Sequence, residues 1–327
     1  MARPNVRLRD NVDTCHKEGV QVLDPRELYS LETEERSLGS PVLIHALSGY
    51  VDAGEAVRLA QQHLLSSFDK RVVARFDVDQ LHDYRARRPA MIFDVDHWES
   101  YADPELLLHA VTDAAGHPFL VLTGPEPDVQ WERYVAAVIS LIERFGVRLT
   151  IGLNAIPMAV PHTRPVGLTS HASRQELIPE NEPWLQRVQV PASASHLLEF
   201  RLRQRGLDAV GFAVHVPHYV AQTEFAPAAE RLVSAIAAAS GLTLATEPLS
   251  AASAAALAEI DKQVGESPEA MALVSSLEQQ YDAYLRGRGK DLLAADATDL
   301  PTAEELGAEL ERFLAEHTRR NRDDREP

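Results

Sequence analysis

Alternating blocks of apolar and amphipathic sequence fill most of the chain. Three short runs are mostly apolar, which is typical of strands buried on both faces of a sheet: 42–47, 147–153 and 208–216. Apolar residues recur at helical spacing in four segments: 53–68, 131–145, 193–205 and 227–241. The central part of the chain is therefore predicted to alternate between strands and helices.

Weaker strand patterns lie between these elements. Half-buried or short strands are predicted at 71–78, 90–95, 166–171 and 188–191, and a β-hairpin joins 106–111 to 118–122. Strands that alternate with helices predict an α/β fold with a mostly parallel mixed sheet and helices on both faces. The hairpin adds antiparallel pairing.

The composition changes after Pro248, where alanine runs replace β-branched residues. Helices are predicted over 251–264, from Ser267 onward, and from Thr302 onward, where Glu305 completes a capping box. We therefore expect four regions: a polar N-terminal arm (1–24), an α/β domain (25–247), a C-terminal helical extension (248–316) and a disordered tail (317–327).

The charge and cysteine content exclude several kinds of protein. With 49 acidic and 32 basic residues the formal net charge is −17, which disfavours nucleic-acid and anionic-membrane partners. Cys15 is the only cysteine, so an intrachain disulfide and a cysteine-based metal cage are excluded. No apolar stretch has the length of a signal peptide core or a membrane span. We expect a cytoplasmic protein.

A glycine turn follows the first buried strand. Gly49 allows a sharp bend, and Asp52 with Glu55 three residues later is a carboxylate variant of a capping box. The turn either offers backbone N–H groups to a ligand or serves only the bend and close packing. Both carboxylates compete with an anion for those N–H groups. No dinucleotide fingerprint or P-loop occurs in the chain, so no cofactor is predicted.

Two proline-rich segments hold further polar side chains. Glu126 lies between two prolines and is either a fixed carboxylate or only the end of a strand. His162, Thr163 and Arg164 also lie between prolines, so they are candidates for a base, a hydroxyl and an anion-binding guanidinium. In the alternative interpretation, Arg164 pairs with a nearby carboxylate and His162 caps a carbonyl group.

Two histidines follow or end the last apolar strand. His215 and His218 have no obvious third ligand, so a structural role is favoured over a metal site. Ser48 is not part of a nucleophile elbow, and Cys15 has no neighbouring motif. The sequence therefore predicts no metal site and identifies no catalytic nucleophile.

Four of these segments together resemble the PAC2 family, the proteasome assembly chaperone 2 proteins and their prokaryotic relatives. They occur in order as GYVDAGEA at 49–56, GPEP at 124–127 followed by Trp131, VPHTRP at 160–165, and VPHY at 216–219. The LEQQYD segment at 277–282 is similar to an actinobacterial branch of this family.

The resemblance implies an architecture related to the nucleoside phosphorylase fold and homo-oligomers, trimers among them. It also implies protein partners such as proteasome subunits, because the eukaryotic namesake assists assembly of the proteasome α-ring. The tail of this chain ends Arg-Glu-Pro and lacks the hydrophobic-Tyr-X ending that docks assembly factors into proteasome rings.

Two functional hypotheses follow. The first is a non-catalytic binding protein or assembly chaperone. The alternative is a phosphorylase- or hydrolase-type enzyme for a small polar, nucleoside-like ligand. Both place the site where these four loop segments meet along one edge of the sheet, with these candidate ligand-binding residues: Gly49, Tyr50, Asp52, Glu55, Glu126, His162, Thr163, Arg164, His218 and Tyr219.

Overall fold

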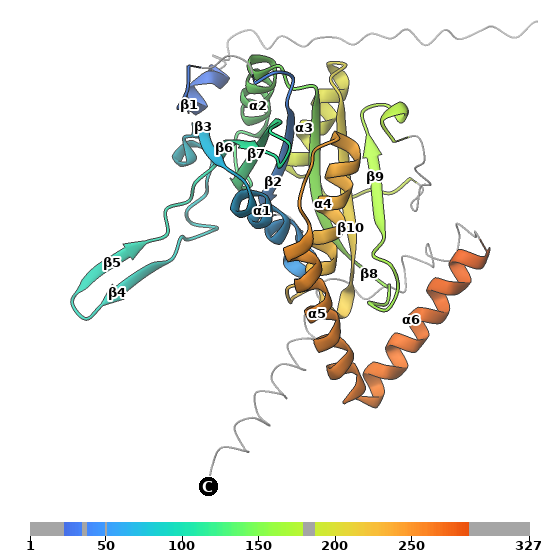
Figure 1. Cartoon of the computed structure of the whole chain (residues 1–327). Helices are drawn as coiled ribbons and strands as arrows, with labels where there is room; N and C mark the ends of the chain where they lie inside the picture. Colours follow the sequence, from blue (N-terminus) through green and yellow to red (C-terminus); the bar gives the residue numbers. More distant parts are fainter. Residues whose placement is uncertain (1–22, 35–37, 50, 179–186, 288–327) are drawn as a thin grey trace, which may run out of the picture.

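The fold was analysed in a computed structural model, which describes residues 23–34, 38–49, 51–178 and 187–287. One mixed sheet of eight strands forms its centre (Figure 1). The strands of this sheet are β1 (Tyr29–Leu31), β2 (Val42–Ser48), β3 (Lys70–Phe76), β6 (Leu107–Thr112), β7 (Pro118–Pro125), β8 (Leu149–Met158), β9 (Leu168–Ala172) and β10 (Ala209–Pro217).

The order of the strands is β1-β3-β6-β7-β2-β8-β10-β9. The four neighbours β7, β2, β8 and β10 are parallel, whereas the pairs on either side of them are antiparallel. The predicted α/β class, the mixed sheet and the β6–β7 hairpin are confirmed. The parallel pairing is confined to the central strands.

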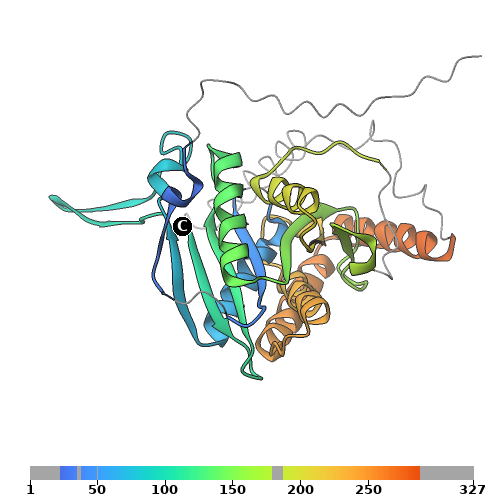
Figure 2. The same ribbon diagram turned by 90° about the horizontal axis from the view of Figure 1, so that it is seen from above.

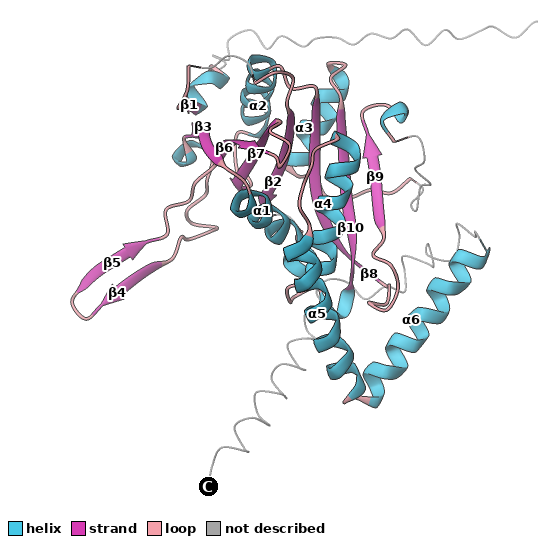
Figure 3. Ribbon diagram, viewed as in Figure 1, coloured by secondary structure: helices cyan, strands magenta, loops and turns pink. Residues whose placement is uncertain are grey.

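Helices cover both faces of this sheet, as predicted (Figures 2 and 3). Successive β2 side chains point to opposite faces of the sheet. Ile44 packs with α1 and α4, while Leu43 packs with α2 and α3. The helices of the α/β part are α1 (Ala56–Ser67), α2 (Trp131–Phe145), α3 (Ala194–Gln204) and α4 (Ala226–Ser240). Short 3₁₀ turns occur at Pro25–Leu28, Ala53–Glu55, Val78–Gln80, Gln175–Leu177 and His218–Val220.

A second, two-stranded sheet projects from the body as a hairpin (Figure 1). It consists of β4 (Met91–Asp94) and β5 (His97–Tyr101), and every residue of both strands is exposed. The sequence predicted only the first strand. Its partner has no clear alternation of apolar and polar residues, which is the pattern that a half-buried strand requires.

Two further helices follow the α/β part, α5 (Glu247–Gly265) and α6 (Pro268–Gly287). Leu249 of α5 joins the core that α1 and α4 form, and α6 extends from the end of α5 (Figure 1). None of the helices in the described ranges is both long and apolar enough to cross a membrane. The division of the chain into four regions stays a prediction, and the predicted arm, third C-terminal helix and tail lie outside the described residues, apart from the last two residues of the arm.

One strand boundary and one predicted strand differ from the prediction. The strand predicted to end at residue 153 continues to Met158 through Pro157, whose partner in β10 is Val216. Pairing between β8 and β2 ends at Gly152. Proline has no backbone N–H to donate, but at position 157 this costs no hydrogen bond to β2. The strand predicted at 188–191 is wrong. These residues are irregular and exposed, and β9 already occupies the outer edge of β10.

Candidate functional site

The carboxyl ends of β7, β2, β8 and β10 form one continuous edge of the sheet, called here the rim. These strands are parallel neighbours, so the segments that follow them emerge side by side. The prediction that the four loop motifs share one edge is confirmed. Their side chains nevertheless form two separate groups of contacts.

The first group surrounds a small hollow at the ends of β2, β7 and β8. It is lined by Leu47, Gly49, Val51, Asp52, Val57, Glu126, Leu153, Asn154, Ser193 and Ser195. The hollow has a volume of about 10 Å³, which is about the space of one water molecule. Two predicted carboxylates and the glycine turn therefore meet in one place.

Asp52 serves the start of α1, but not in the predicted way. Its carboxylate accepts the backbone N–H groups of Val57, at 2.8 Å, and Arg58, at 3.0 Å. Glu55 adopts a left-handed backbone, so the helix begins at Ala56, three residues later than predicted. The capping box is wrong, because the Glu55 side chain binds Arg58 instead. Burial raises the pKa of Asp52, although the hydrogen bonds from the Val57 and Arg58 N–H groups act to lower it.

Glu126 joins β7 to α3. Its Oε1 accepts the backbone N–H of Ala194 at 2.6 Å, while the adjacent Ser193 hydroxyl accepts the N–H of His196 at 3.1 Å. The carboxylate and the hydroxyl thus satisfy two N–H groups in the first turn of α3. Burial raises the pKa of Glu126, although the Ala194 hydrogen bond and the Arg87 charge oppose it.

Gly49 is required by the close approach of β7. Its φ is +130°, and a Cβ would lie 2.8 Å from Arg87 Nη1 and 3.3 Å from Glu126 Cβ. Arg87 also donates to the Glu126 carbonyl and pairs with Asp128 at 2.7 Å. The glycine thus has a structural purpose at the wall of the hollow.

The second group is centred on His162, which is 5% exposed. Its backbone N–H donates to the Tyr219 hydroxyl at 2.8 Å, and its Nδ1 lies 2.6 Å from the same oxygen. Its Nε2 lies 3.1 Å from Asp261 Oδ1 of α5. Burial raises the pKa of Tyr219 to about 12. His162 thus connects the β8 loop, the β10 end and α5.

Arg164 binds α6 through two carboxylates. Its Nε and Nη2 donate to the two oxygens of Asp282 at 2.9 and 2.8 Å, and its Nη1 lies 3.0 Å from Glu278. The Thr163 hydroxyl also donates to Glu278. The guanidinium is therefore engaged by carboxylates from the C-terminal helix, which favours the ion-pair interpretation over an open anion site. These contacts hold the pKa of Asp282 below its usual range.

The two histidines of β10 and its end lie in different surroundings. His218 packs edge-on against Tyr219 at 5.5 Å, and burial lowers the pKa of its imidazole. His215 is buried, and its Nε2 lies 2.8 Å from the Thr169 hydroxyl. Within the described ranges, no three or more His, Cys, Asp or Glu side chains form a group suited to a metal ion. Tyr50, another predicted site residue, lies outside those ranges.

Several rim residues were missed by sequence reasoning. Asn154, Ser193 and Ser195 line the hollow, while Asp261, Glu278 and Asp282 reach the rim from α5 and α6. The segment at 277–282 was the available signal for the last two. Single helical carboxylates give no indication of which distant loop they contact.

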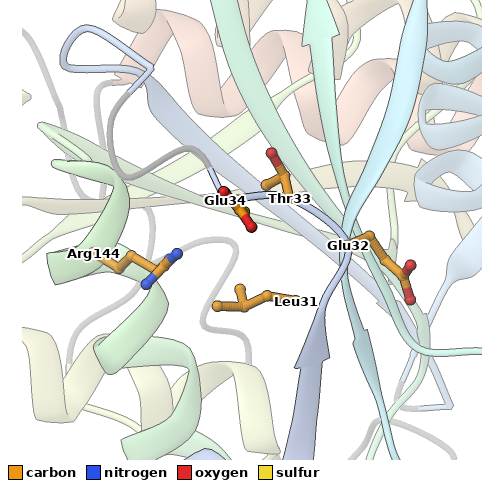
Figure 4. A pocket seen from close by; sticks show the side chains of 5 residues that line it. All are labelled: Leu31, Glu32, Thr33, Glu34 and Arg144. Atoms are coloured by element: carbon orange, nitrogen blue, oxygen red, sulfur yellow. The ribbon is translucent and has the colours of Figure 1, made fainter.

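A larger cleft lies elsewhere, beside edge strand β1. It has a volume of about 650 Å³ and is lined by Leu31, Glu32, Thr33, Glu34 and Arg144 (Figure 4). Arg144 lies in the last turn of α2, which leads to the amino end of β8. None of the predicted site residues borders this cleft.

Comparison with solved structures shows close relatives. A Mycobacterium tuberculosis protein of unknown function, Rv2714, is 47% identical with a TM-score of 0.77, over 82% of this chain and 94% of that chain. A Corynebacterium glutamicum protein of unknown function is 39% identical with a TM-score of 0.76, over 80% of this chain and 100% of that chain.

A more distant likeness shows the fold alone. The M. tuberculosis proteasome-assembly chaperone homologue Rv2125 is 23% identical with a TM-score of 0.65, over 71% of this chain and 99% of that chain. None of the curated proteins matches the chain. The family model described as the PAC2 family matches residues 46–264, which include all four rim segments. The chain belongs to the PAC2 family.

Proposed function

We propose that this protein is a non-catalytic binding protein of the assembly-chaperone type, which uses its rim to bind protein subunits and acts as a cytoplasmic homo-oligomer. Proteasome subunits are the proposed class of partner. The rim is the proposed contact surface because the four segments that resemble the family lie along it, within the residues that the family model matches.

One observation carries the non-catalytic part of this proposal: the charged candidate residues of the rim, Asp52, Glu55, Glu126 and Arg164, bind other groups of the protein. Asp52 and Glu126 bind N–H groups of two helix starts, and Arg164 binds α6. The hollow of about 10 Å³ is also far smaller than the roughly 300–1,000 Å³ of small-molecule sites. This geometry favours binding of a protein over a phosphorylase or hydrolase reaction.

The choice of partner is supported by relatives of the same fold. Rv2125 is described as a proteasome-assembly chaperone homologue, and Pyrococcus furiosus PbaB as an archaeal proteasome activator. Their identities of 23% and 16% show only a shared fold, so the partner class is an inference from family membership.

Assembly of proteasome subunits in the presence of the full-length protein tests the proposal. Purified α and β subunits are mixed with the protein, and complexes are followed by native mass spectrometry. We expect a complex with α subunits and faster ring formation. Two rim substitutions, Val51→Asp and Val129→Asp, target exposed apolar side chains and should weaken both effects.

Phe200→Asp is the control, because Phe200 is an apolar residue on α3 that is at least as exposed as Val51 and Val129. It should behave as the unaltered protein. If neither a complex nor a change in assembly rate appears, the proposed partner is wrong. Equal effects of all three substitutions would contradict the rim as the contact surface.

Self-association is supported by the projecting β4–β5 hairpin. Its apolar side chains are exposed, with Val95 at 89% and Trp98 at 63%. An isolated two-stranded hairpin is at best marginally stable in water. Exposed aromatic and aliphatic side chains on such a hairpin favour burial against a second copy of this chain.

A further inference from the structure

A cluster of two histidines and a glutamate lies between α3 and the sheet. Register pairs place His45 of β2 beside Gly152 of β8, Gly152 beside Gly211 of β10, and Gly211 beside His171 of β9. Two histidines therefore flank two glycines in one row across four strands. Glu199 of α3 lies above this row, in contact with both histidines.

The two glycines provide the space for this cluster. A Cβ at Gly152 would lie 2.8 Å from His45 Nε2 and would also meet the Glu199 carboxylate. A Cβ at Gly211 would meet the His171 ring. The imidazoles and the carboxylate thus rest directly on the backbone of the sheet.

Glu199 joins α3 to two strands. Its Oε2 lies 2.7 Å from His171 Nε2, and its Oε1 lies 3.9 Å from His45 Nε2. His45 is 1% exposed, and neither of its ring nitrogens has a hydrogen-bond partner among the described residues. The His171 side chain is 42% exposed, so solvent reaches the cluster through this residue.

The cluster is connected to the rim. His196 lies one helical turn before Glu199, and its Nε2 is 2.9 Å from Nδ2 of Asn154. Asn154 lines the hollow, as do Ser193 and Ser195 at the start of α3. The position of α3 therefore affects the shape of the hollow.

The charges of the cluster depend on one another. Burial acts to raise the pKa of Glu199, but its hydrogen bond from His171 and the nearby histidine charges hold that pKa below its ordinary value of 4.5. Burial acts to lower the pKa of His171, but the Glu199 carboxylate holds it above the ordinary 6.5. Burial lowers the pKa of His45 to about 4, so His45 is neutral near pH 7. Burial also lowers the pKa of His196.

We propose that His171 and Glu199, packed against the neutral ring of His45, form a pH-sensitive clamp that fixes α3 to the sheet and sets the shape of the hollow at the rim. The protonated His171 is the group that compensates the buried carboxylate. A buried carboxylate without such compensation is costly, so loss of the His171 proton weakens the attachment of α3.

The pKa shifts of His171 and Glu199 determine at which pH the clamp is stable. The raised pKa of His171 gives a contribution that is complete below pH 6.5 and is lost as the pH rises through the raised value. The lowered pKa of Glu199 gives a contribution that is present above pH 4.5 and is lost as the pH falls through the lowered value. The clamp is therefore closed at mildly acidic pH and opens on the alkaline side.

Amide hydrogen exchange of the full chain between about pH 6 and pH 9 tests this clamp. The protection factors of α3 are compared with those of α4, which is packed into the core on the other face. We expect the α3 protection relative to α4 to fall roughly tenfold over this range, as for loss of a hydrogen bond to a charged group.

Two variants and a control complete the experiment. His171→Gln and Glu199→Gln each remove one charge and should make the α3 protection ratio independent of pH. His97→Gln changes an exposed hairpin histidine and should keep the full pH dependence. A constant ratio in the unaltered protein, or an unchanged pH profile in both cluster variants, would overturn the clamp. Because the readout is α3 itself, the result does not depend on the partner of the rim.

Discussion

At the scale of single residues, Gly152 and Gly211 matter for space and not for backbone freedom. Neither has a φ in the left-handed region, so any residue fits their backbone conformation. Their hydrogen atoms leave room for His45, His171 and Glu199. A sequence shows only that a strand contains a glycine, and the reason lies in side chains from other strands.

Gly152→Ala is expected to destabilise the protein by about 1–3 kcal/mol, the usual cost of inserting a methyl group into packed surroundings. The added Cβ would press on His45 and on the Glu199 carboxylate. Gly265→Ala at the end of α5 is the control, because a Cβ there meets no atom within 4 Å. Urea denaturation measures both, and equal midpoints for the two variants would contradict this packing argument.

Several residues that the sequence predicted as candidates do lie at the rim, but their partners were not predicted. Asp52 and Glu126 were predicted, since a capping position and two flanking prolines mark them locally. The contact of Asp52 with Val57 depends on the start of α1, which a left-handed Glu55 places three residues later than predicted. The contact of Glu126 with Ala194 depends on how close α3 lies to the end of β7. Buried His45 and Glu199 carry no local signal at all.

At the scale of elements, the C-terminal helices are attached to the rim by a few charged contacts. Arg164 reaches Asp282 and Glu278 of α6, and His162 reaches Asp261 of α5. The α6 residues Val274, Leu277 and Tyr281 are buried along the same helix. The attachment therefore combines an apolar stripe with ion pairs.

Arg164→Gln should increase amide exchange along α6 while leaving α4 unchanged, because it removes the bidentate contact with Asp282. The matched control is Arg286→Gln, which removes a positive charge from the last turn of α6 itself. Exchange mass spectrometry resolves both helices. If the two variants expose α6 equally, the Arg164 contacts do not hold this helix.

Regular elements were predictable where the hydrophobic pattern is strong. The structure has strands where the apolar runs predicted them, at β2 and β10. It also has helices where the helical spacing predicted them, at α2 and α4, and both end at the predicted glycines, Gly146 and Gly241. Prediction failed where neighbours decide the outcome. Pro157 is tolerated in β8 because the β2 ladder has ended, and 188–191 has no free β10 edge to join.

At the scale of the whole molecule, the β4–β5 hairpin extends the chain far beyond the sheet (Figure 1). Its Phe93 and Trp98 rings pack edge to face at 5.1 Å, yet both remain largely exposed. Such a pair is a typical anchor of an interface. The hairpin is therefore the surface that we propose for self-association.

Phe93→Asp combined with Trp98→Asp should shift the protein to a smaller assembly, measured by native mass spectrometry or light scattering. Phe200→Asp is the matched control, since Phe200 is 54% exposed and Phe93 is 56% exposed. It should leave the mass unchanged. A monomeric unaltered protein would refute self-association, and an unchanged assembly in the double variant would exclude the hairpin as its basis.

The contacts between Arg164 and α6 have one more consequence. They are partly open to water, so dissolved ions compete with them, and at physiological ionic strength the field of an exposed charge fades within about 8 Å. The apolar contacts of the same helix do not weaken in this way. Dilute buffer should therefore hold α6 more tightly against the 160–165 loop than a solution of physiological ionic strength does.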